Sequence, residues 1–115
     1  MQKEATLKNI KFIRREQYNK IGLVFNFQVE SIGEVSKTIN IPKHTKSQRS
    51  GLGKLIRDLN LVIPDSYLDS HFLLAQTLES QLKQKNMLVK IESTGKKLYP
   101  FNIIDIRDSY INSVL

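Results

Sequence analysis

The most regular pattern in the sequence is the alternation of apolar and polar residues from Ile21 to Glu30. Apolar side chains occupy every second position of this segment, at Ile21, Leu23, Phe25, Phe27 and Val29. Successive side chains of a strand point to opposite faces, so the pattern predicts a strand with one apolar and one amide-bearing face. We predict that it is the central strand, with Phe25 and Phe27 in the core.

Four further segments are predicted to be strands, at residues 6–15, 35–41, 87–93 and 97–106. The tight connection 31–34 contains Gly33, which can adopt a positive φ angle. In the last strand the apolar parity changes between Ile103 and Ile104, and Pro100 cannot donate a ladder hydrogen bond. This combination predicts a β-bulge and a position at the edge of the sheet.

Two helices are predicted between the third and fourth strands. Leu52, Leu55, Ile56 and Leu59 follow the i, i+3, i+4, i+7 spacing of a buried helical stripe. This helix would begin at the N-cap Ser50 and stop by Ile63, because Pro64 follows. Leucines at intervals of four, Leu74, Leu78 and Leu82, predict a second helix. It would be capped by Asp69 or Ser70 and run to about residue 85.

The predicted order is three strands, a helical segment and two strands. This is the order of the OB-fold, a five-stranded barrel with a helix between its third and fourth strands. We predict a mainly β protein with helices, a single domain over 1–115 with a helical insertion at 42–86. A tail at 107–115 would pack on the barrel or make a subunit contact. An SH3-like barrel lacks the helical insertion, and a generic α+β sandwich is the other alternative.

The charge of the chain favours a polyanionic partner. Eighteen lysines and arginines against eleven acidic residues give a net charge of +7, with a sequence pI near 9.7. Between Val35 and Arg57 there are six basic residues and no acid. Alternatively, these residues form a solvent-exposed basic surface that serves solubility alone, but a block of cations without acids favours nucleic-acid binding.

Other classes of protein are disfavoured by composition. The chain contains no cysteine, which excludes disulfides, a cysteine nucleophile and thiolate metal sites. Its longest run of consecutive apolar residues is 72–75, which is too short to span a bilayer. Residues 1–6 do not read as a signal peptide, so a cytoplasmic location is expected, in the host cytoplasm if the protein is viral.

No residue pattern points to catalysis, a metal or a cofactor. The two histidines, His44 and His71, do not have the spacing to each other or to carboxylates that is typical of metal ligands. The segment Ser50–Leu55 departs from the phosphate-binding loop motif at two positions, because Gln48 replaces a glycine and Leu55 replaces Ser or Thr. We therefore expect that the protein is not an enzyme.

The strand meander, the helical middle, the return strand 88–92 and the hairpin 93–97 resemble small bacteriophage single-stranded-DNA-binding proteins with an OB-fold. The resemblance covers about residues 6–105. It implies non-sequence-specific binding and protection of single-stranded DNA in phage or mobile-element replication or recombination, and we expect a homodimer. The tail 109–115 lacks acids and the chain lacks tryptophan, so recruitment through an acidic tail and tryptophan stacking are not expected. RNA in place of DNA is not distinguished.

Two loops, 14–20 and 94–97, carry adjacent cations and would flank the binding face of such a barrel. Phosphates need cations along the strand, and bases need exposed rings, for which Tyr18 and Tyr99 are candidates. The amide face offers hydrogen bonds to bases or sugars, although a solvated sheet face is equally compatible. The candidate nucleic-acid-binding residues are Arg14, Arg15, Tyr18, Lys20, Asn26, Gln28, Lys37, Lys43, Lys46, Arg49, Lys54, Lys96, Lys97 and Tyr99.

A second function remains open from the sequence. The basic barrel surface could instead bind an acidic protein partner, making the chain an interaction module of a replication or virion complex.

Overall fold

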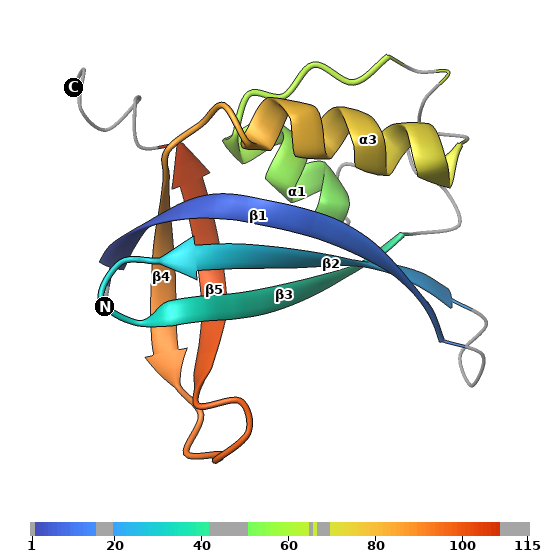
Figure 1. The fold of residues 1–115 in the computed structure, drawn as a ribbon. Coiled ribbons are helices and arrows are strands. Elements are labelled where there is room, and N and C mark those ends of the chain that lie inside the picture. The colour runs from blue at the N-terminus through green and yellow to red at the C-terminus, as the bar shows by residue number, and fades with distance from the viewer. Residues whose placement is uncertain (1, 16–19, 42–50, 65, 67–69, 109–115) are drawn as a thin grey trace.

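Five strands and two helices make up the fold in the computed structural model, which describes residues 2–15, 20–41, 51–64, 66 and 70–108. The elements are, in chain order, β1 (Gln2–Arg15), β2 (Lys20–Val29), β3 (Gly33–Ile41), α1 (Gly51–Asp58), α3 (His71–Leu82), β4 (Met87–Ser93) and β5 (Phe101–Asp108). The antiparallel strands form one sheet that curls into a half-barrel, and both helices lie over the same side of it (Figure 1). The mainly β class and the predicted element order are confirmed.

The sheet is organised around β1. Its hydrogen-bonded order is β3-β2-β1-β4-β5, so the prediction that residues 21–30 form the central strand is wrong. That segment, as β2, lies between β3 and β1. The 14-residue β1 pairs through residues 2–5 with β4 and through residues 5–15 with β2. One long strand thereby joins both halves of the sheet.

A β-bulge in β1 explains its irregular alternation. The register with β2 shifts between Leu7 and Asn9, which leaves Lys8 as the extra residue. Ala5 and Leu7 are buried before the bulge, whereas Ile10 packs against the core after it. One inserted residue therefore reverses which parity of the strand faces inward.

The apolar face of β2 forms the centre of the core, as predicted. Phe25 and Phe27 are fully buried, and their rings meet edge to face with centroids 6.4 Å apart. Leu23 and Val29 extend the same buried row. The helices cover this face with their own leucines: Leu52, Leu55, Leu74, Leu78 and Leu82.

Helix α1 ends earlier than Pro64 requires. Asn60 adopts φ 52°. Its amide donates to Arg57 O at 3.2 Å, and the Leu61 amide donates to Ile56 O at 3.0 Å. This pair of bonds is a Schellman motif, which terminates the helix at a left-handed residue.

The N-cap of α3 is Ser70, one of the two residues predicted, and its hydroxyl accepts from the Leu73 amide. The proposed cap Ser50 and the alternative cap Asp69 lie outside the described residues. The predicted start of the tail at Arg107 is wrong, because Arg107 and Asp108 pair with β4 as part of β5, and the rest of the tail lies outside the described residues.

Strand β5 confirms the predicted bulge and edge position. Its register with β4 shifts so that Lys90 faces Asp105 and Ile91 faces Ile103, which leaves Ile104 as the extra residue. Ile103 and Ile106 are buried while Ile104 is 43% exposed. The predicted start at Lys97 is wrong, because β5 begins at Phe101 and the preceding residues form a longer loop.

Candidate nucleic-acid interface

The loop between β4 and β5 presents cations and an aromatic ring together. Lys96 and Lys97 are exposed, and Leu98 and Tyr99 have 86% and 73% of their surface exposed. The loop projects from the half-barrel on the side opposite the helices (Figure 1). These features match the combination of phosphate-binding charge and stacking surface expected of a single-strand binding element.

Hydrogen bonds around Thr94 order this loop. The Thr94 amide donates to Pro100 O at 3.0 Å. Its hydroxyl donates to Tyr99 O and accepts from the Lys96 amide at 3.1 Å. Gly95 takes φ 73°, in the left-handed region that a side chain would strain. The hydrogen bonds of Thr94 to Lys96, Tyr99 and Pro100 thus order the backbone of the loop.

The second predicted loop is described only at its base. Arg14 is exposed near the end of β1. The backbones of Arg15 and Lys20 are paired in register, and Tyr18 lies outside the described residues. Figure 1 shows this end of β1 and β2 extending past β3, well away from the 94–100 loop.

Of the candidate residues in the basic block between Val35 and Arg57, the structure describes Lys37 in β3 and Lys54 in α1, whereas Lys43, Lys46 and Arg49 lie outside the described residues. Lys37 stands between Val35 and Ile39, both buried, so its side chain lies on the core side of β3. Its Nζ donates to Ile103 O at 2.9 Å, joining β3 to β5. Burial lowers the pKa of Lys37, and Lys54 lowers it further while Asp105 opposes the shift.

Lys54 is held by two carboxylates. Its Nζ lies 2.6 Å from Asp58 Oδ2 and 3.2 Å from Asp105 Oδ1, and Asp105 also accepts from Arg107 at 2.9 Å. These hydrogen bonds raise the pKa of Lys54. Burial alone raises the pKa of Asp105, but the bonds from Lys54 and Arg107 outweigh it and the pKa is lowered overall. The cluster ties α1 to β5 and occupies a lysine predicted for phosphate contact.

The lowered pKa of Asp105 predicts a pH-dependent stability. Folding favours its charged form, so the stabilisation is complete above its ordinary pKa of 3.8 and is lost as the pH falls through the lower folded value. We expect Asp105→Asn to lose less stability on acidification than the unchanged protein. The difference should be no more than about 1 kcal/mol, since Lys54 and Arg107 are largely exposed. Urea unfolding at several acidic pH values measures it, and identical pH profiles for both proteins would contradict it.

Asn26 is buried in a network of cross-strand side-chain hydrogen bonds. It is 8% exposed, its Nδ2 donates to Asn9 Oδ1 at 2.6 Å, and its Oδ1 accepts from the Ser36 hydroxyl. The three residues come from β1, β2 and β3. Their mutual bonds satisfy the amide group predicted to contact bases or sugars.

Replacing Asn26 with alanine should therefore act on stability. The change leaves Asn9 and Ser36 without their partner, which costs about 1–3 kcal/mol. Chemical denaturation measures this cost, and binding of oligo-dT by the folded fraction should stay within about twofold. A large loss of oligo-dT binding with unchanged stability would show that Asn26 contacts the ligand instead.

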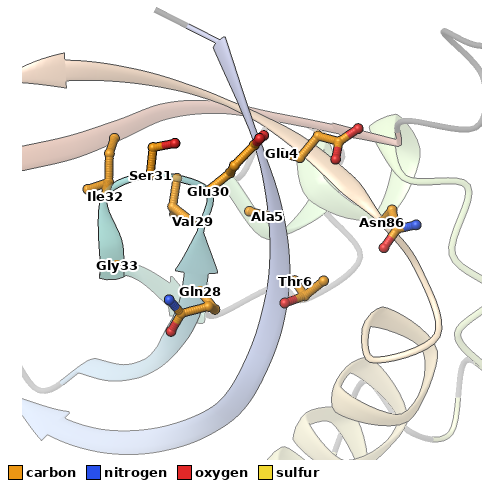
Figure 2. A pocket seen from close by; sticks show the side chains of 10 residues that line it. All are labelled: Glu4, Ala5, Thr6, Gln28, Val29, Glu30, Ser31, Ile32, Gly33 and Asn86. Carbon is orange, nitrogen blue, oxygen red and sulfur yellow. The ribbon is translucent and has the colours of Figure 1, made fainter.

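Gln28 lies beside an acidic hollow. Figure 2 shows it next to a recess lined also by Glu4 and Glu30, at the β2–β3 turn. Glu34, nearby in β3, pairs with Lys8 at 3.2 Å. Carboxylates near the β2–β3 turn repel phosphates. Gln28 is thus exposed but surrounded by unfavourable charge for a nucleic acid.

The other end of the β1–β2 pair is basic, and some of its exposed residues were not among the candidates named from the sequence. Lys11 is exposed on the face of β1 opposite Arg14, and Phe12 has 44% of its surface exposed. On the other loop Leu98 was also missed. The bulge at Lys8 in β1 decides where Lys11 and Phe12 point, and the imperfect alternation of this segment was its only signal in the sequence.

The described residues contain no group of three or more His, Cys, Asp or Glu side chains placed to hold a metal ion. Within the same part of the chain, no helix has the length and apolar character needed to cross a membrane.

Lys96, Lys97 and Tyr99 are thus brought together on one loop, with Arg14 at a separate end of the sheet. Comparison with known proteins adds no assignment to this geometry. No protein-family model matches the chain, and a search of curated proteins found no significant match.

Proposed function

We propose that the half-barrel is an OB-fold and that the protein binds single-stranded DNA without sequence specificity. The element order and the helices between the third and fourth strands support the fold assignment. The hydrogen bond from Lys37 of β3 to Ile103 O of β5 supports it too, because a closed barrel needs its two edge strands, here β3 and β5, to approach each other. The net charge of +7 supports a polyanionic ligand.

The observation that carries the proposal is the 94–100 loop. Lys96 and Lys97 offer two cations to successive phosphates, and Tyr99 offers a ring face to a base. Stacking tolerates every base, so this combination binds without reading sequence. Arg14 and Lys11 offer further exposed cations at a separate end of the sheet. The ordered loop backbone lowers the entropy cost of binding.

The biological setting remains the one that the phage resemblance suggests. Protection of single strands during phage or mobile-element replication or recombination fits a small, basic, non-catalytic domain. A homodimer would double the cationic surface along one strand. RNA offers the same phosphates and stackable bases and stays an alternative ligand.

Titration of fluorescent oligo-dT in competition with unlabelled single strands and duplexes tests the proposal. Single-stranded DNA should compete at least about tenfold better than duplex of equal phosphate content, because duplex bases are not free to stack on Tyr99. Single-stranded RNA of the same length separates the two nucleic acids. Equal or tighter binding of duplex would overturn the single-strand assignment.

A further inference from the structure

Among the described residues, part of β1 has one edge that pairs with no other strand. Residues 2–5 pair with β4 on one side, but β4 does not continue along β1 beyond Ala5. From residue 6 onward, the described part of the chain pairs β1 only with β2. The Ile10 amide confirms which way the other edge faces, because it donates to Glu79 Oε2 of α3 at 3.2 Å.

Geometry extends this edge to Phe12 and Arg14. In an antiparallel pair, the N–H and C=O groups of alternate residues point to the same side. The backbone groups of Phe12 and Arg14 therefore point away from β2, as those of Ile10 do. An exposed row of this kind is a template for another extended chain.

An apolar groove lies directly beside the edge. Its volume is about 380 Å³, and it runs between β1 and α3. Ile10, Phe12, Phe72 and Ala75 supply its apolar surface, and Phe72 is 67% exposed. Alternate side chains of an added strand would point into this groove. An edge and an apolar groove together are the two requirements of recognition by strand addition.

The charges around the groove select the occupant. Arg14 is exposed and lies on the same face of β1 as Ile10 and Phe12, whereas Lys11 points to the opposite face. Among the described residues that line the groove, the one carboxylate is Glu79, which pairs with Lys83 at 2.9 Å and accepts from the Ile10 amide. These contacts lower the pKa of Glu79, so it stays charged and paired. The exposed guanidinium of Arg14, on the same face as Ile10 and Phe12, therefore adds a positive charge next to the groove that complements an acidic residue.

We propose that this edge binds an extended segment of a partner protein, with apolar residues at alternate positions and acidic residues beside them. The segment would pair with the backbone at Phe12 and Arg14 and place an apolar side chain between Phe12 and Phe72. This goes beyond the proposed DNA binding and does not rest on it, since the 94–100 loop takes no part. It would let the protein recruit a partner while its loop holds a nucleic acid.

A fluorescent peptide with alternating Ile/Val and Asp/Glu residues tests the proposal by anisotropy against the full-length protein. Phe72→Ser should weaken binding at least about tenfold, because burial of one phenylalanine contributes that factor. Phe72 is exposed, so the variant should fold, and circular dichroism verifies this. Leu98→Ser is the matched control: it removes an exposed apolar residue elsewhere and should leave peptide binding unchanged.

Amide hydrogen exchange followed by NMR provides the strand-specific measurement. Peptide binding should slow exchange at Phe12 and Arg14, and a peptide N-methylated at its two central edge-facing amides should not bind. The proposal is overturned by no binding at peptide concentrations on the order of 1 mM, by equal binding to Phe72→Ser, or by unchanged exchange at both amides.

Two other occupants would also overturn the proposal. Oligo-dT that slows exchange at Phe12 and Arg14 while the peptide does not would assign the edge to nucleic acid. A concentration-dependent dimer that is lost in Phe72→Ser would assign it to a second copy of the chain. Oligo-dT binding that depends on Lys96 and Lys97 is measured separately, so failure of either proposal leaves the other distinguishable.

Discussion

Phe25→Ala should destabilise the protein by about 3–5 kcal/mol, the cost of a large cavity in a packed core. Phe25 has no exposed surface and meets Phe27 edge to face, beneath the leucines of both helices. Domains of this size are stable by only about 5–15 kcal/mol. The variant should therefore be partly unfolded near 37 °C, and any loss of nucleic-acid binding should follow the unfolded fraction.

Urea unfolding monitored by circular dichroism measures this effect. Phe72→Ala is the matched control, because it makes the same substitution at a largely exposed side chain and should cost under about 1 kcal/mol. A Phe25→Ala variant that keeps its stability but loses oligo-dT binding would mean that this ring acts as a stacking surface, contrary to its buried position.

Tyr99→Ala should weaken oligo-dT binding by roughly 5- to 150-fold, the equivalent of about 1–3 kcal/mol for one stacked base. The ring is largely exposed, and the Tyr99 backbone carbonyl, rather than its side chain, accepts from Thr94. Removing the ring should consequently leave the loop and the stability of the fold unchanged. Fluorescence titration at fixed salt measures the affinity.

Tyr99→Phe keeps the stacking face and should restore most of the affinity lost in Tyr99→Ala. Leu98→Ala, at the neighbouring exposed position, should change the affinity by less than about threefold. If Tyr99→Ala binds as tightly as the unchanged protein, the ring does not stack on a base and the loop acts through charge alone.

Alternation in the sequence was enough to predict the strands and much of the core. The parity change between Ile103 and Ile104 also predicted the β5 bulge, because two large apolar residues marked it. The position of the β1 bulge was marked only by an imperfect alternation, since both Lys8 and Asn9 are polar. The middle place of β1 depends on pairing with β4, some 80 residues away in sequence, and alternation carries no information about it.

The candidate residues divide in a similar way. Lys96 is exposed on a local loop, as the turn residues predicted, whereas Tyr99 lies on this loop although it was predicted to lie in the last strand. Lys37 and Lys54 instead contact Ile103 and Asp105 of β5. These partners come from distant segments, so a basic residue in the sequence does not reveal whether its charge is already paired.

The salt dependence of binding isolates the role of the loop lysines. For single strands, the logarithm of the binding constant falls with the logarithm of salt concentration by about 0.7 per phosphate neutralised. The variant Lys96→Ala/Lys97→Ala removes two exposed cations and should leave the fold intact. Lys83→Ala, which removes a cation on the helix side, is the control and should keep the slope of the unchanged protein.

Oligo-dT titrations over a series of salt concentrations therefore test most directly whether the 94–100 loop binds phosphates. The slope of Lys96→Ala/Lys97→Ala should be shallower than that of the unchanged protein by about 1.4, corresponding to two lost phosphate contacts. Equal slopes for the two proteins would contradict the assignment of this loop as the nucleic-acid interface.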